Sequence, residues 1–156
     1  MTNMEIMSLG INEARKTMNE GIGGAFGAVI TKDGEIITVA SNRVLSDNDP
    51  TAHAEMVAIR RACEKLGTYD LTGCELYATG YPCPMCLAAI IWANIKKVYV
   101  CGQPEDAAAI GFRDDFIYDF IEGKRKDEET LEIVPLDREP AQKLYEEYAR
   151  MNRTVY

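Results

Sequence analysis

With 156 residues, of which 47% are hydrophobic, the chain has the length of one ordinary domain and enough apolar side chains for a single core. Its 17 Lys and Arg residues against 25 Asp and Glu residues give a net charge of −8, which disfavours general binding to nucleic acid. No apolar run is long enough for a membrane span, and no signal-peptide layout opens the chain. We therefore expect a cytoplasmic protein with one domain, residues 1–156.

The first elements are a helix and a hairpin. Residues 3–20 carry apolar side chains among charges in a helical pattern that ends in a glycine cluster. Residues 26–31 and 35–40 are rich in β-branched side chains, and between them lies Asp33-Gly34, a strong hairpin signal. The chain is therefore predicted to open as helix, strand, turn and strand.

The next helix is predicted to begin in the cluster Asn-Asp-Pro-Thr at residues 48–51. It continues to Gly67, which can form a left-handed cap. This assignment places His53 and Glu55 in the first turn of the helix.

The rest of the chain continues the alternation of strands and helices. We predict a strand at 75–79, a helix at 84–93, a strand at 96–102, two weak helical pieces within 105–122, a strand at 131–136 and an amphipathic helix at 139–151. The strand–helix–strand unit at 75–102 is typical of a parallel crossover. The expected fold is α/β, a three-layer α-β-α sandwich with a mixed five-stranded central sheet.

The residues that carry chemistry lie in two short segments. His53, the only histidine, stands in Pro-Thr-Ala-His-Ala-Glu, and Cys83 and Cys86 stand in Pro-Cys-Pro-Met-Cys. One imidazole and two thiolates are three ligands of the kind zinc prefers, and they leave a fourth tetrahedral position for water. Glu55 is a carboxylate placed to move protons to and from that water. Residues two apart on a regular helix point to roughly opposite sides, however, so spacing alone does not bring His53 and Glu55 to one site.

Other interpretations of the cysteines stay open. One of Cys63, Cys74 and Cys101 could complete a closed, structural zinc site, although we expect all three to be small core residues. The Cys-x-x-Cys pair alone could also be a redox dithiol.

The metal motif, His-x-Glu followed by Pro-Cys-x-x-Cys, resembles the zinc-dependent nucleobase deaminases of the cytidine deaminase superfamily. Within that superfamily the chain is similar to the bacterial guanine deaminases over nearly its whole length. The similarity is carried by residues 23–30, 32–34, 48–55, 82–86, 91–93, 106–108, 111–112 and Tyr156.

The resemblance implies one zinc per subunit, held by His53, Cys83 and Cys86. Zinc lowers the pKa of its water, and the resulting hydroxide attacks the amino-bearing carbon of the base. Glu55 serves as the catalytic proton shuttle, so that guanine becomes xanthine and ammonia. Backbone N–H groups near Ala54 and Cys83 balance the developing charge.

The resemblance also implies substrate-binding roles for Phe26, Asn42, Trp92, Asp114 and Tyr156. Without the resemblance, Phe26 and Trp92 would be interpreted as core residues. Asn42 would be a turn residue and Asp114 an acidic residue at a helix start. In the family the C-terminal segment is exchanged between the subunits of a homodimer, which would bring Tyr156 to the partner's site.

Two positions depart from the family pattern, and the residue that reads the base could be either of two adjacent aspartates. Tyr81 stands where these deaminases usually carry glutamate, and Ala25 where guanine deaminases often carry proline. Asp115 adjoins Asp114, so either could read the base. Cytosine, isocytosine, guanosine or another aminopurine therefore stays an alternative substrate. A tRNA adenosine deaminase is disfavoured by the net charge, and a non-catalytic zinc module by Glu55.

Overall fold

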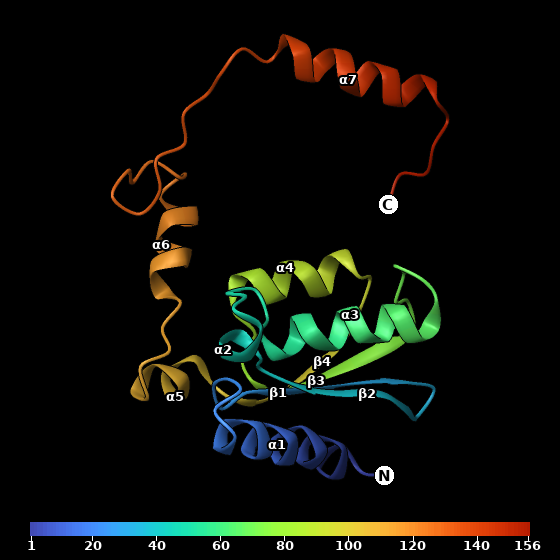
Figure 1. Cartoon of the computed structure of the whole chain (residues 1–156), viewed down its shortest axis with the longest axis vertical. Coiled ribbons are helices and arrows are strands. Elements are labelled where there is room, and N and C mark those ends of the chain that lie inside the picture. Colours follow the sequence, from blue (N-terminus) through green and yellow to red (C-terminus); the bar gives the residue numbers. More distant parts are fainter. The chain divides into compact units, whose positions relative to one another are not determined.

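The computed structural model describes residues 1–156, which form two compact units, Met1–Asp115 and Phe116–Tyr156. The first unit is built on a mixed sheet with the strand order β2-β1-β3-β4 (Figure 1). Its strands are β1 (Gly27–Lys32), β2 (Glu35–Ser41), β3 (Cys74–Gly80) and β4 (Val98–Gly102). β1 runs antiparallel to both β2 and β3, whereas β3 and β4 are parallel.

Helices cover both faces of this sheet (Figure 1). α1 (Asn3–Asn19) lies on one face, and α3 (Ala54–Leu66) and α4 (Pro84–Trp92) lie on the other. The start of α1 is fixed by a capping box, in which the Thr2 side chain accepts from the Glu5 N–H and the Glu5 carboxylate accepts from the Thr2 N–H. The predicted three-layer α/β arrangement is thus confirmed.

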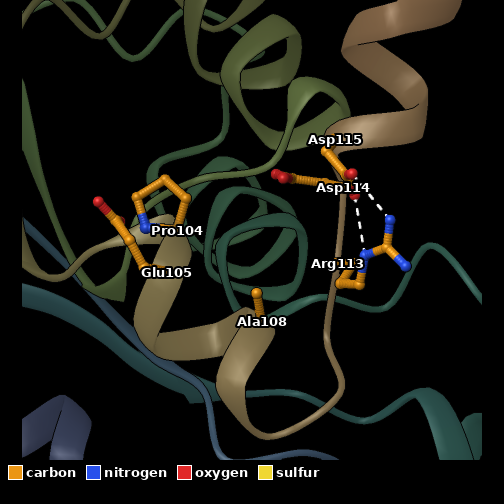
Figure 2. Close-up of a pocket in the computed structure, with 6 residues that line it drawn as sticks. All are labelled: Pro104, Glu105, Ala108, Arg113, Asp114 and Asp115. Carbon is orange, nitrogen blue, oxygen red and sulfur yellow. Dashed lines mark hydrogen bonds and ion pairs between the residues drawn. The ribbon is translucent and has the colours of Figure 1, made fainter.

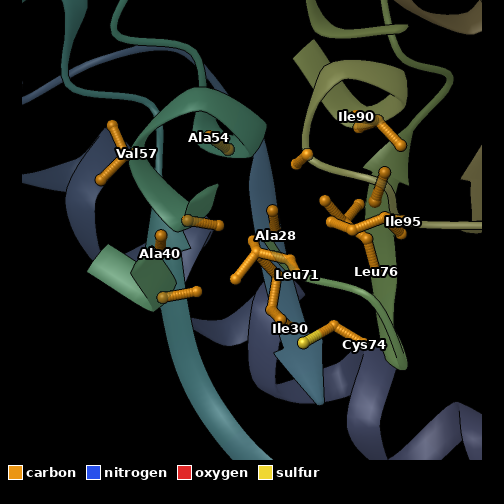
Figure 3. Close-up of a cluster of buried hydrophobic side chains, with 14 of the residues drawn as sticks. Ala28, Ile30, Ala40, Ala54, Val57, Leu71, Cys74, Leu76, Ile90 and Ile95 are labelled. Atoms are coloured by element: carbon orange, nitrogen blue, oxygen red, sulfur yellow. The ribbon is translucent and has the colours of Figure 1, made fainter. Parts of the chain in front are cut away.

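The hairpin turn has the conformation that its sequence favours. Asp33 and Gly34 both have positive φ, at 50° and 81°, as a two-residue primed turn requires. The strands that it joins bury Ala28, Ile30 and Ala40 completely, and these side chains form the core with those of α3 and α4 (Figure 3). This core packs the N-terminal half of α3 and, through Ile90, the C-terminal half of α4 against the sheet.

The predicted start of the second long helix is wrong. A short helix, α2 (Val44–Asp47), ends at Asn48, whose φ of 49° is left-handed. The chain then turns, because Asp49 accepts hydrogen bonds from both the backbone and the hydroxyl of Thr51. α3 therefore begins only at Ala54, and it ends as predicted at Gly67, with a φ of 67°.

The strand–helix–strand unit is confirmed as β3, α4 and β4. α5 (Pro104–Ala109) and α6 (Asp115–Glu122) are the two expected helical pieces, and α7 (Glu139–Arg150) is the final helix. The predicted strand at 131–136 does not form, so the sheet has four strands rather than five. Pro135 lacks an amide donor, and the unit Phe116–Tyr156 contains no strand with which the segment could pair.

No helix combines the length and the apolar character that crossing a membrane requires.

Candidate metal centre and its surroundings

His53 lies just outside the helix to which the sequence assigns it. It is the N-cap residue of α3 and has an extended backbone, with φ −65° and ψ 157°. Its N–H donates to the Thr51 carbonyl at 2.8 Å, and its own carbonyl accepts from the Val57 N–H at 2.9 Å. Because His53 is extended, regular helical spacing does not set its direction, and nothing prevents His53 and Glu55 from facing the same region.

Cys83 has the same place at the start of α4. Its backbone is extended, with φ −66° and ψ 170°, and Pro84 follows at the first helical position. One turn into the helix Cys86 is fully buried. The three candidate ligands thus lie at an N-cap or in the first turn of a helix. Backbone N–H groups without an intrahelical partner stabilise negative charge at such positions.

The three donor atoms converge. The Nδ1 atom of His53 lies 3.6 Å from Sγ of Cys83 and 3.6 Å from Sγ of Cys86. All three donors lie within 4.8 Å of one another. For tetrahedral zinc with bonds of about 2.3 Å to sulfur and about 2.05 Å to nitrogen, the nitrogen and sulfur atoms stand roughly 3.6 Å apart. The donor set and its spacing therefore fit a zinc ion.

The pKa values of the two thiols shift in opposite directions. A hydrogen bond from Cys86 lowers the pKa of Cys83 to about 4, with a further contribution from His53. The same bond raises the pKa of Cys86, because Cys86 is its donor. The bond to Cys83 also raises the pKa of His53. The site thus stabilises a thiolate, which is the form that binds a metal.

No other cysteine joins this group. Cys74 is buried as expected and Cys63 is half-buried, but Cys101 is exposed on β4, so the expectation of a core residue there is wrong. The arrangement of three ligands with one position left over is that of an open site rather than a closed one.

Glu55 is the buried carboxyl beside the three donors. Glu55 is only 7% exposed, and this burial raises the pKa of its carboxyl. A carboxyl that holds its proton more tightly than in water is suited to taking up and returning protons near neutral pH. Ala54, the first residue of α3, is also fully buried, and its N–H is among those that no intrahelical carbonyl can reach.

Asn42 follows β2 and is buried. Its Oδ1 accepts from the Val44 N–H at 3.0 Å and from the Gly24 N–H at 3.3 Å. These bonds fix which way the amide faces, so the Nδ2 group remains as the donor that Asn42 can offer. Phe26 precedes β1 and packs edge-on against Phe112, with ring centroids 5.1 Å apart and planes at 88°. The sequence assigned no separate role to Phe112; only its place in the Gly-Phe pair of the resemblance pointed to it.

A hollow of about 370 Å³ lies beside α5, and its lining includes Arg113, Asp114 and Asp115 (Figure 2). The two aspartates differ in their partners. Asp115 forms a two-pronged ion pair with Arg113, at 2.8 and 3.1 Å. Partial burial raises the pKa of Asp114, and the negative charge of Cys83 raises it further. Of the two aspartates, Asp114 is thus the one whose pKa is raised by burial and by Cys83.

Trp92 and Tyr156 are the remaining predicted substrate residues, and Tyr81 is the position that departs from the family pattern. Trp92 is the last residue of α4 and is 73% exposed, with roughly 13 Å of helix between it and the N-cap Cys83. Tyr156 belongs to the unit Phe116–Tyr156 and is exposed. Tyr81 stands two residues before Cys83 and is 44% exposed. The roles of Trp92 and Tyr156 stay predictions.

Comparison with known proteins gives a consistent result. Residues 1–102 match the family model of the cytidine and deoxycytidylate deaminase zinc-binding region. The guanine deaminase of Bacillus subtilis (strain 168) is 49% identical over 131 residues, 84% of this chain and 83% of that protein. The X-ray structure of guanine deaminase from Bacillus subtilis superposes with a TM-score of 0.92 at 40% identity, covering 100% of this chain and 99% of the other. A tRNA-specific adenosine deaminase of Aquifex aeolicus (strain VF5) is 47% identical over 92 residues, 59% of this chain and 60% of that protein.

Proposed function

Because the chain belongs to the cytidine and deoxycytidylate deaminase family, whose members are zinc-dependent hydrolases of C–N bonds, we propose that it deaminates guanine to xanthine and ammonia. The observation that carries this proposal is the convergence of His53, Cys83 and Cys86 beside the buried carboxyl of Glu55. The likeness to a guanine deaminase over the full chain supports guanine as the base.

In this proposal His53, Cys83 and Cys86 would hold zinc, which would supply a Lewis acid that lowers the pKa of a water molecule toward neutrality. Glu55 takes one proton from that water at a carboxylate oxygen and passes it to a ring nitrogen. It then takes the second proton from the same oxygen and passes it to the departing amine, which leaves as ammonia. The free N–H of Ala54 donates a hydrogen bond to the attacking oxygen as negative charge develops on it. Burial of Glu55 keeps competing solvent away from the proton in transit.

Three residues read the base in the same proposal. Asn42 donates from Nδ2 to an acceptor on the edge of the purine, since its Oδ1 is held by backbone N–H groups. Phe26 bounds the ring, supported by its contact with Phe112. Asp114 accepts from guanine N–H groups, because Asp115 is already paired with Arg113.

The test is ammonia release by the purified zinc-loaded protein with guanine, guanosine, adenine, cytosine and isocytosine. Glu55→Gln serves as the blank; its amide keeps the shape but cannot take up the proton, and we expect a loss of about 100- to 10,000-fold in kcat at unchanged zinc content. Selective turnover of guanine supports the proposal. Turnover of another base would keep the roles of zinc and Glu55 and would make Tyr81 the first position to examine for altered specificity.

The proposal extends to a single functional domain that works in the cytoplasm as a homodimer. The unit Phe116–Tyr156 supports the homodimer, because none of its residues is buried although α6 and α7 carry apolar side chains such as Phe116, Leu144 and Tyr145. Such faces are stable only when something covers them, and a second copy is the occupant that we propose.

In that dimer Trp92 and Tyr156 help to close the substrate site, Tyr156 that of the partner. Deletion of residues 154–156 should then cut guanine turnover sharply at unchanged zinc content, and sedimentation should show twice the chain mass. Unchanged turnover after the deletion would remove Tyr156 from the site.

A further inference from the structure

A cluster of three side chains, Asp49, Thr51 and Arg60, ties the loop before α3 to the helix itself. Asp49 Oδ1 accepts from the Thr51 hydroxyl at 2.7 Å and from the Thr51 N–H at 2.8 Å. Arg60, on α3, donates from Nη2 to the Thr51 hydroxyl at 3.1 Å, and its Nη1 lies 3.7 Å from Asp49 Oδ2. The Thr51 hydroxyl is thus donor to one charged group and acceptor from the other.

One hydrogen bond connects this cluster to His53, the candidate metal ligand. The Thr51 carbonyl accepts the His53 N–H at 2.8 Å, and the Asp49 carbonyl accepts the Ala52 N–H at 3.1 Å. His53 is an extended N-cap residue, so the helical hydrogen-bond ladder does not fix its N–H. The loop therefore has to determine where its imidazole points.

We propose that Asp49 and Arg60 are positioning residues for His53, acting through Thr51. They hold the Thr51 carbonyl at the place where the His53 N–H meets it, and so keep Nδ1 at 3.6 Å from both cysteine sulfurs. Because Arg60 lies about two turns along the helix whose first turn carries Glu55, the cluster also fixes the imidazole relative to that carboxyl.

A purely structural role predicts something different. Arg60 and Asp49 are 53% and 37% exposed, and exposed ion pairs of this kind add little to the stability of a protein. If the cluster positions a ligand, its loss should alter metal binding while the melting temperature changes little. The inference rests on the zinc occupancy that the proposed function requires, but not on the identity of the substrate.

The experiment compares Asp49→Ala, Thr51→Val and Thr51→Ser with Asp47→Ala in the zinc-loaded full chain. Asp47 is a matched control, because it is an exposed carboxylate two residues away that pairs with Arg43 at 3.3 Å and has no bond to Thr51. The readouts are the rate of zinc transfer to a colorimetric chelator and the visible spectrum of the cobalt(II)-substituted protein, whose d–d bands report ligand geometry.

Partners that orient a metal ligand typically change metal affinity by about 10- to 100-fold, so Asp49→Ala and Thr51→Val should release zinc at least about tenfold faster, with altered cobalt bands. Thr51→Ser keeps the hydroxyl and should release zinc at the wild-type rate. Asp47→Ala should also release zinc at the wild-type rate. Wild-type release and spectrum in Asp49→Ala and Thr51→Val would overturn the proposal, as would equal acceleration in Asp47→Ala.

The same measurements separate this proposal from the functional one. A wild-type protein that holds zinc but leaves guanine intact would contradict the function, and the release rates would still decide the role of the cluster. A wild-type protein that holds no zinc would overturn both.

Discussion

Gly23 lies against Asn42 with no space for a side chain, since a Cβ at residue 23 would overlap both the carbonyl oxygen and Oδ1 of Asn42. Gly23→Ala should therefore displace the amide that we propose reads the base. We expect KM for guanine to rise by about tenfold or more and the free energy of unfolding to fall by roughly 1–3 kcal/mol, as overpacking of a filled site does. Steady-state kinetics and urea unfolding measure the two effects.

Ala25→Ser is the control for that substitution, because it adds one heavy atom to an exposed residue of the same loop. It should leave both quantities near their wild-type values. A Gly23→Ala protein with the wild-type KM would show that the position of Asn42 does not matter to the substrate.

Asp114 and Asp115 form a matched pair for a test of base recognition. A hydrogen bond to a charged group contributes about 1.5–3 kcal/mol, so Asp114→Asn should raise KM for guanine by about 10- to 100-fold. Asp115→Asn should change KM far less, because that carboxylate is engaged by Arg113. Kinetics with guanine decide the matter, and the reverse ranking would assign base recognition to Asp115.

The five cysteines should differ in their reaction with an aromatic disulfide reagent. Cys101 is exposed and should react first, whereas burial raises the pKa of Cys63 and of Cys74 and so makes them slow. Cys83 and Cys86 should become reactive only after a chelator removes zinc.

Loss of zinc should also lower the melting temperature, since a ligand at about 1,000 times its dissociation constant stabilises the folded state by about 4 kcal/mol. In Cys101→Ser the fast phase should vanish and the chelator-dependent phase should stay. A thiol count that the chelator does not change would contradict the assignment of the ligands.

Asp70 gives a prediction for acid stability. Its Oδ1 accepts from the Thr72 hydroxyl at 2.6 Å, from the Thr72 N–H at 3.0 Å and from the Asn94 amide at 3.1 Å, and the bond from the hydroxyl is the largest cause that lowers its pKa below 3.8. A lowered carboxyl pKa stabilises the folded state above pH 3.8, and the stabilisation is lost as pH falls through the folded-state pKa. Asp70→Asn should thus be less stable than wild type at pH 7, with the difference shrinking in strong acid.

Thermal melts of wild type and Asp70→Asn at several pH values measure this effect. Thr72→Val removes the hydroxyl and should reproduce part of the loss at pH 7. A difference that persists unchanged below the folded-state pKa would mean that the charge of Asp70 is not its cause.

Local signals predicted most of the first unit. The Asp33-Gly34 turn, the left-handed cap at Gly67 and the crossover from β3 through α4 to β4 depend on short-range stereochemistry that a sequence displays. The start of α3 was misplaced because Asn48, Asp49 and Thr51 are residues that favour both turns and helix caps, and here the turn prevails.

The metal motif could be identified from the sequence, but the geometry of its residues could not be predicted. His53 and Glu55 seemed incompatible on a regular helix, and the extended backbone of His53 removes that objection. The fifth strand was predicted from the strand-like character of residues 131–136, and Cys101 was expected in the core because no second cysteine stands at a metal-ligand spacing from it. Neither signal says whether a neighbouring strand or a packing partner is present: residues 131–136 pair with no strand, and Cys101 is exposed.

Trp92 is the only tryptophan of the chain, and it is 73% exposed at the end of α4. The intrinsic fluorescence of the protein therefore arises almost wholly from one indole at one point of the surface. An indole in water emits at longer wavelength than one in an apolar environment, so dilution of the protein would move the emission maximum to the red if a second chain covers that surface. The protein thus carries its own optical probe of association, and no label is required.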